Sequence, residues 1–112
     1  MIALSGLLLS FQVMASGSVL INGKEIKSQD HLHTTLAKEL NFPRHYGKTL
    51  DALYDTLSSD YSGQTIIKIK FVSILKSKLG ADYTDALIQA IMDASDDNPK
   101  VVLVLELSLI HI

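Results

Sequence analysis

The sequence predicts an α/β domain built on a small three-stranded parallel sheet with helical crossovers. The predicted order is strand, helix, helix, strand, helix, helix, strand (β-α-α-β-α-α-β). Residues 65–71 alternate between apolar and polar side chains, which is typical of a half-buried strand. Between the predicted strands, leucines and alanines recur at the three- and four-residue spacing of helices. Because helical crossovers connect parallel strands, the sheet is expected to be parallel.

The first half of the chain predicts one strand and two capped helices. The strand is a short apolar run at residues 18–21, closed by Asn22-Gly23, a strong turn signal. Ser28 and Thr49 each stand where an N-cap residue would open a helix. The apolar faces of these helices are Leu32, Leu36, Ala37 and Leu40 in the first, and Leu50, Leu53 and Leu57 in the second.

The second half predicts the central strand, two more helices and a last strand. In the central strand, Ile67, Ile69 and Phe71 are expected to face the core. A short helix then runs to Gly80, which suits a C-cap, and Asp82 with Asp85 resembles a capping box that opens the next helix. Residues 96–99 predict a turn, and the apolar run at residues 101–106 predicts a strand buried on both faces.

Length and composition exclude several classes of protein. A chain of 112 residues allows one domain with one core. Its formal net charge of −2 argues against a protein that grips nucleic acid directly, because such proteins are normally basic. The chain has no cysteine, which excludes disulfides and thiolate metal sites and fits a reducing compartment such as the cytoplasm. No cofactor or metal site is expected.

The two ends of the chain are expected to lie outside the domain, which we assign to residues 18–106. Residues 1–17 are apolar but too short for a transmembrane helix, so no membrane association is expected. They predict either an upstream extension, with Met14 opening the true chain, or a weak signal-like segment that lacks a basic n-region. Residues 107–112 match the translation of a sequencing adapter, and we expect them to be read-through.

The acidic residues gather in two windows that contain no lysine or arginine. Residues 49–67 contain Asp51, Asp55 and Asp60, and residues 79–99 contain five more aspartates. Asp51 and Asp55 are neighbours on one helix face, where like charges four residues apart cost a few tenths of a kcal/mol. Asp51 gains from the positive end of the helix dipole, whereas Asp55 lies past the first turn. Such a cost without local compensation indicates a strongly positive external partner, although solvated helix faces are the simpler explanation.

Four stretches of the chain match the sequence pattern of one known protein family. The strongest is FPRHYGKTLDALYDTL at residues 42–57, where the family has a proline, two positions that are often aromatic, a glycine and a Leu-Asp-Ala-Leu-aromatic-Asp helix. VLINGKEIKS at residues 19–28 is also similar, as is the helix with Leu32, Leu36, Glu39 and Leu40, and a weaker match runs from residue 87 into the last strand. In these stretches the sequence resembles the barstar family of ribonuclease inhibitors. The resemblance implies a barstar-like fold of three parallel strands with helices packed on them, in agreement with the order predicted above.

The resemblance also implies that the loop and the second helix plug the active site of a small basic ribonuclease. By position, Asp55 would enter the pocket for the scissile phosphate, and Asp51 would support it. Tyr46 and Gly47 would pack against the enzyme, and Tyr54 stands where the family's founder has tryptophan. The full set of implied partner-binding residues is His45, Tyr46, Gly47, Thr49, Asp51, Tyr54, Asp55, Ser59, Asp60 and Asp93.

Several of these positions depart from the family pattern. His45 replaces an expected tyrosine, Thr49 replaces an asparagine, and Ser59-Asp60 replaces a Gly-Trp pair. Asp93 stands where the founder has a glutamate that reaches an enzyme arginine, and its side chain is one methylene shorter. These changes affect the identity of the partner more than the mode of binding.

Other functions are less well supported by the residues. His31 and His33 lie on different sides of a helix without accompanying carboxylates, so we expect surface or partly buried histidines rather than metal ligands. His45 could equally be a loop histidine with no role. No nucleophile elbow, phosphate loop or metal signature predicts an enzyme. The remaining alternative is a non-enzymatic acidic module that binds another basic protein. In either case we expect a monomer before complex formation.

Overall fold

The computed structural model describes residues 16–60 and 63–106. The expectations for residues 1–15 and 107–112 therefore lie outside the described residues. The elements are β1 (Ser16–Asn22), α2 (Gln29–Leu40), α3 (Leu50–Asp55), a π-helical turn η1 (Thr56–Asp60), β2 (Gln64–Lys70), α4 (Val72–Leu79), α5 (Ala81–Asp97) and β3 (Val101–Glu106).

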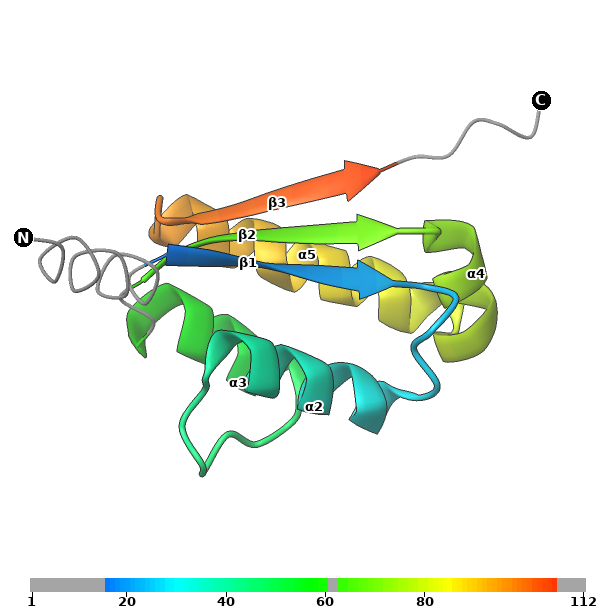
Figure 1. The fold of residues 1–112 in the computed structure, drawn as a ribbon, viewed down its shortest axis with the longest axis horizontal. Helices are drawn as coiled ribbons and strands as arrows, with labels where there is room; N and C mark the ends of the chain where they lie inside the picture. Colours follow the sequence, from blue (N-terminus) through cyan, green and yellow to red (C-terminus); the bar gives the residue numbers. More distant parts are fainter. Residues whose placement is uncertain (1–15, 61–62, 107–112) are drawn as a thin grey trace, which may run out of the picture.

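The strands form one three-stranded sheet in the order β1-β2-β3, with both pairs parallel (Figure 1). In the register, Ser18 pairs with Ile66, and Ile66 pairs with Val102. Each strand reaches the next through two helices, which confirms the predicted fold class and element order. The carboxyl ends of the strands point toward α4, while α5 runs back to the end at which the strands begin (Figure 1).

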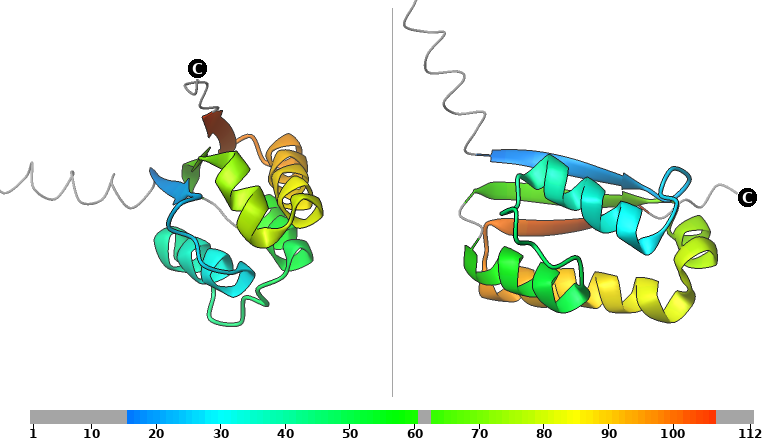
Figure 2. Two further views of the ribbon diagram at one scale, coloured as in Figure 1. Left: turned by 90° about the vertical axis from the view of Figure 1, so that its right-hand side faces the viewer. Right: turned by 90° about the horizontal axis from the view of Figure 1, so that it is seen from below.

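The helices α2, α3 and α5 pack on one face of this sheet, as the view from below displays (Figure 2). The core lies between the two layers. Strands contribute inward-facing residues such as Ile21, Ile67 and Ile69, and each helix contributes leucines or isoleucines that are almost completely buried. The leucines and isoleucines of the helices that are at most 1% exposed are Leu32, Leu36, Leu53, Leu75, Leu87 and Ile91.

The prediction that β3 is buried on both faces is wrong. Val101 is buried, but Val102 is 45% exposed and Val104 is 38% exposed. The cause is that the helices leave the second face of the sheet open, so outward-facing residues of every strand meet solvent in the described part of the chain. Leu20 of β1 and Ile66 of β2 lie on the same open face, exposed by 49% and 45%.

The predicted helix caps are confirmed at three of the four helices. The hydroxyls of Ser28 and Thr49 accept hydrogen bonds from the backbone N–H groups of His31 and Ala52, both at 3.0 Å. Gly80 ends α4 at φ 95°, a left-handed conformation that favours glycine. However, Gly80 also precedes α5 with no side-chain cap, so the predicted capping box of Asp82 and Asp85 is wrong.

Two further details define the carboxyl end of the sheet. Phe71 is not part of the central strand, because it lies at φ 56° between β2 and α4 and only partly in the core. The Asn22-Gly23 turn passes very close to this residue. A Cβ added to Gly23 would stand 2.3 Å from the Phe71 carbonyl oxygen, so the turn requires glycine at this position.

Candidate partner-binding site

The acidic helix α3 is capped at its first turn and packs against the core on its inner side. Thr49 caps its first turn, and Leu53 is completely buried in the core. Asp51 and Asp55 are both exposed, one on either side of Leu53 in the sequence. A helix of six residues has little stability of its own, so the buried side chains of Leu53 and, in the turn that follows, Leu57 hold the backbone of the two aspartates in place.

A π-helical turn, Thr56–Asp60, continues α3 past Asp55. The hydroxyl of Ser59 donates a hydrogen bond to the Asp55 carbonyl oxygen at 3.0 Å, and Ser59 is exposed beside it. The Asn98 side chain, just after α5, donates to the Leu57 carbonyl oxygen at 2.8 Å. The turn is therefore tied to the end of α5. The side chain of Asp60, which ends the turn, lies outside what the structure describes.

A groove of about 460 Å³ separates α3 from α5. Apolar groups of Leu50, Ala86 and Ala90 line it, together with the carboxylates of Asp51 on one helix and Asp93 on the other. The Gln89 amide donates to the Asp93 carboxylate at 2.9 Å, which orients that carboxylate. The structure thus brings together Asp51, Tyr54 and Asp93, three residues predicted from the sequence, around one groove.

Tyr54 connects the two walls of this groove. Its hydroxyl donates a hydrogen bond to the carboxylate of Asp97, four residues after Asp93 on α5. This bond is the largest cause of the raised pKa of Tyr54, with burial and the charges of Asp97 and Asp93 adding to it. Asp97 was missed as a site residue. Its position one turn after Asp93, within an acidic window, was the available signal.

The α2–α3 loop lies beside α3, and its residues differ in how far they are exposed. His45 and Gly47 are exposed, as predicted for a binding loop. Tyr46 is only half-buried. Its ring centroid lies 4.8 Å from that of Phe42, and its hydroxyl lies 2.6 Å from Nδ1 of His33. The ring and the hydroxyl of Tyr46 thus make contacts within the protein, so only part of the side chain is available to a partner.

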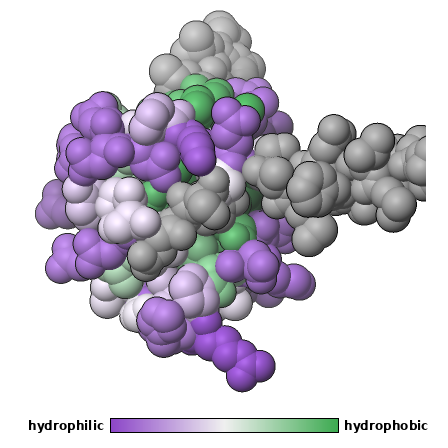
Figure 3. All heavy atoms as spheres, turned by 90° about the vertical axis from the view of Figure 1, so that its left-hand side faces the viewer, coloured by the Kyte–Doolittle hydropathy of each residue, from purple (hydrophilic) through white to green (hydrophobic). Residues whose placement is uncertain are grey.

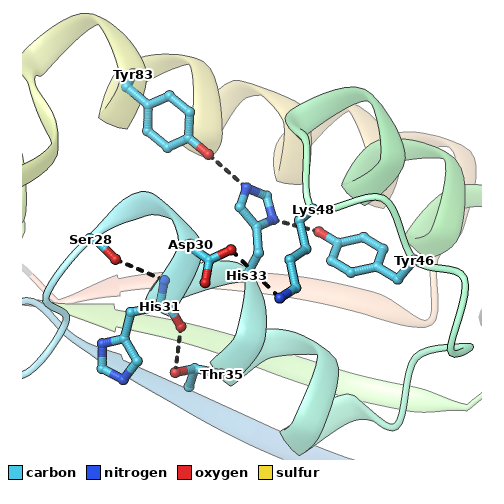
Figure 4. Close-up of polar contacts among 8 residues, drawn as sticks. All are labelled: Ser28, Asp30, His31, His33, Thr35, Tyr46, Lys48 and Tyr83. Atoms are coloured by element: carbon cyan, nitrogen blue, oxygen red, sulfur yellow. Dashed lines mark hydrogen bonds and ion pairs between the residues drawn. The ribbon is translucent and has the colours of Figure 1, made fainter.

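The expectation that His33 is a surface or partly buried histidine is wrong. Its side chain is 1% exposed and lies between the hydroxyls of Tyr46 and Tyr83, each 2.6 Å from a ring nitrogen (Figure 4). Burial lowers the pKa of the imidazole, and the nearby charges of Asp30 and Lys48 act in opposite directions. His31 is partly buried, as expected, and its Nδ1 accepts the Lys27 N–H at 2.9 Å.

The loop carries positive charge next to the acidic helix. Arg44 and Lys48 are exposed, and Lys48 forms an ion pair with Asp30 at 3.5 Å. Lys48 also has φ 57°, a left-handed conformation that is uncommon for residues other than glycine. Hydrophilic residues cover most of the described surface at the end of the molecule where the strands begin and α5 ends (Figure 3). The described carboxylates of the candidate site lie on α3 and on the second half of α5.

The described residues offer little for other chemistry. Among residues 16–60 and 63–106, no group of three or more histidines or carboxylates could hold a metal ion. Within the same ranges, no helix has both the length and the apolar character needed to cross a bilayer.

Comparison with known proteins identifies the family of this chain. A protein of Bacillus subtilis (strain 168), named "Putative ribonuclease inhibitor YrdF", is 29% identical over 79 residues. The alignment covers 70% of this chain and 86% of that protein. The family model described as Barstar (barnase inhibitor) matches residues 17–108, which include every described helix and nearly every described strand residue. The chain therefore belongs to the barstar family.

Proposed function

We propose that this protein inhibits a ribonuclease by covering its cationic active site with the acidic surface of α3 and α5. The observation that carries the proposal is the pair of exposed carboxylates, Asp51 and Asp55, held on a helix whose inner side is completely buried. Family membership supports a ribonuclease as the partner. The name of the Bacillus subtilis relative supports the same class of partner.

In this proposal Asp55 takes the place of the scissile phosphate. A carboxylate resembles a phosphate oxygen pair in charge and in its ability to accept several hydrogen bonds. Because α3 is anchored by Leu53 and capped by Thr49, the backbone that carries this carboxylate is already in place before the partner arrives. Preorganisation of this kind lowers the entropic cost of binding.

The groove between α3 and α5 suits a long basic side chain of the partner. Its aliphatic part would lie along the apolar lining residues, and its charged head would meet Asp51 and Asp93 on the two helices. Tyr54, held by Asp97, would border the same side chain. The inhibitor needs no chemistry of its own, since occupation of the cleft is sufficient.

The partner is proposed to be small and basic, and the inhibitor to be a monomer in the cytoplasm before the complex forms. The lack of cysteine supports a reducing compartment. A face that is acidic on α3 and α5 would steer a cationic enzyme toward the correct orientation, and the barnase–barstar pair is itself the reference example of such steering.

The central test measures RNA cleavage by a small basic ribonuclease titrated with the protein over a series of salt concentrations. We expect stoichiometric inhibition at low salt, and an association rate that falls steeply as salt increases. Long-range attraction is screened within about 10 Å at 0.1 M ionic strength, whereas close contacts are screened less. Dissociation should therefore change less than association. Inhibition with a flat association rate would contradict steering, and binding without inhibition would favour an acidic module for another basic protein.

The cationic loop gives a second test of the electrostatic proposal. Lys48→Glu should raise the association rate with a basic ribonuclease severalfold at low salt, because it removes a positive charge beside Asp51. Its ion pair with Asp30 is exposed, so loss of that pair should change stability by less than about 1 kcal/mol. Lys27→Glu is the matched control. It makes the same change of charge in the β1–α2 connection, at the other end of α2 (Figure 1).

A clear result requires stopped-flow association rates for both variants at low and high salt. At low salt, the association rate of Lys48→Glu should exceed that of Lys27→Glu. The two rates should converge as salt increases. A slower association for Lys48→Glu would mean that Lys48 meets an acidic group of the partner, and the proposed cationic cleft would have to exclude this loop.

A further inference from the structure

A buried hydrogen-bonded chain links α5 to the loop beside the acidic helix. Tyr83 lies near the start of α5, His33 is in α2, and Tyr46 is in the α2–α3 loop (Figure 4). Nε2 of His33 is 2.6 Å from the Tyr83 hydroxyl, and Nδ1 is 2.6 Å from the Tyr46 hydroxyl. Through His33, the start of α5 is therefore joined to a loop that lies far from it in the sequence.

Because imidazole has two different ring nitrogens when neutral, the two hydrogen bonds of this chain must run in the same direction. Burial lowers the pKa of His33, which keeps the ring neutral near pH 7. A neutral imidazole has one N–H donor and one nitrogen acceptor. One tyrosine hydroxyl must therefore donate to the ring, and the other must accept from it. The proton position on one side of His33 consequently fixes the role of the hydroxyl on the other side.

The conformation of the α2–α3 loop depends more on the contacts of the Tyr46 side chain than on backbone hydrogen bonds within the loop. Between Pro43 and Lys48, the backbone makes one hydrogen bond with described residues outside helices, from Tyr46 N–H to the Pro43 carbonyl oxygen at 3.0 Å. The Tyr46 side chain is held by Phe42 and His33, and another contact that ties the loop to α2 is the exposed ion pair of Lys48 with Asp30. Exposed His45 and Gly47 lie on either side of it in the sequence. Their positions therefore follow from how Tyr46 is held.

We propose that Tyr83 is a positioning residue for the binding loop, because its hydroxyl occupies the second nitrogen of His33 and so helps to fix the ring orientation that holds the Tyr46 hydroxyl inward. This inference rests on the proposed function, since it assigns a role to the shape of the same surface. Tyr83 itself is on α5, away from the acidic end of that helix, and need not touch the partner. Without its hydroxyl, Nε2 of His33 loses its hydrogen-bond partner among the described residues, and the ring is held only through Nδ1.

The expected consequence is a loop that samples several conformations before binding. Only a fraction of the molecules would then be competent to bind, and the apparent affinity falls by that fraction. The loss should appear mainly in the association rate, because the complex itself contains the same contacts. Loss of a residue that only stabilises the fold would not slow association while leaving dissociation nearly unchanged.

The test compares Tyr83→Phe with the unmodified protein, first without any partner. The ring nitrogen chemical shifts of His33, measured by ¹⁵N NMR, report the tautomer, and amide hydrogen exchange reports the loop. We expect changed ring nitrogen shifts of His33, because Nε2 loses its partner, and faster exchange at Tyr46 and Gly47, with little change in the exchange of core strands. Tyr46→Phe should give a similar exchange pattern, whereas His31→Gln, on the same helix but outside the chain of hydrogen bonds, should give none.

The second measurement is association with a small basic ribonuclease. Tyr83→Phe should slow association by about three- to tenfold while dissociation changes less than twofold. In the Tyr83→Phe, Tyr46→Phe double variant, the loss of binding free energy should be smaller than the sum of the losses in the two single variants, because both residues act through His33. Unchanged His33 shifts and loop exchange in Tyr83→Phe would overturn the inference, whether or not the protein inhibits a ribonuclease. A protein that inhibits no ribonuclease would refute the proposed function, while the measurements on the free protein would still decide the role of Tyr83.

Discussion

Replacing Asp55 by alanine is expected to remove most of the inhibition of a ribonuclease while leaving the fold as stable as before or slightly more stable. The Asp55 side chain is exposed, and it makes no ion pair or hydrogen bond with other described residues. Its truncation therefore leaves the core intact. Removing the repulsion with Asp51 at helical spacing should return a few tenths of a kcal/mol.

The effect on binding should be much larger, for a different reason. In the proposed complex, cationic groups of the enzyme are removed from water and neutralised by the Asp55 carboxylate. Alanine would leave those groups buried without a partner, a loss of roughly 2–5 kcal/mol or more, a general range to which the barnase–barstar pair itself contributes. That free energy corresponds to a decrease in affinity of about thirtyfold to several thousandfold, since 1.4 kcal/mol is a factor of ten.

Inhibition of RNA cleavage and chemical denaturation should be measured on the same preparation of Asp55→Ala. Asp82→Ala is the control, because it removes an exposed aspartate in the first turn of α5, away from the acidic end of that helix. It should inhibit normally. If Asp55→Ala unfolds easily, Asp55 has a structural role, and if it inhibits like the control, the acidic helix is not the part that enters the cleft.

The sequence predicted those elements in which local pattern and tertiary environment agree. The alternation in β2, with Ile67 and Ile69 inward and Lys68 outward, is reproduced because helices cover one face of the sheet. The caps at Ser28 and Thr49 were predictable because their hydrogen bonds join residues three apart. The acidic positions of α3 could also be placed, since a helix face follows from spacing alone.

The prediction failed where burial depends on distant parts of the chain. The apolar run of β3 has the composition of a strand covered on both sides, yet Val102 and Val104 face solvent because the helices pack on one face. The environment of His33 was equally hidden, because its partners lie 13 and 50 positions away. The link between Tyr54 and Asp97 spans 43 positions, and no local pattern indicates it.

The second large effect concerns the support beneath the acidic helix. Leu53→Ala should lower the free energy of unfolding by roughly 2–5 kcal/mol, the usual range for a leucine removed from a close-packed core. Leu53 is 0% exposed, and it stands between the two aspartates that the proposed function requires. Because α3 has six helical residues, it cannot compensate by its own helical stability.

Leu20→Ala provides the matched control, since it makes the same change at a residue that is 49% exposed on the open face of the sheet. Urea denaturation of both variants should give a clearly larger loss for Leu53→Ala than for Leu20→Ala, whose truncation leaves no buried cavity. Under conditions where Leu53→Ala is still folded, it should also inhibit more weakly, because α3 can then shift over the cavity and carry Asp51 and Asp55 with it. Equal losses of stability in the two variants would mean that α3 is not held by the core. The two carboxylates would then not be preorganised, even if Asp55 contacts the enzyme.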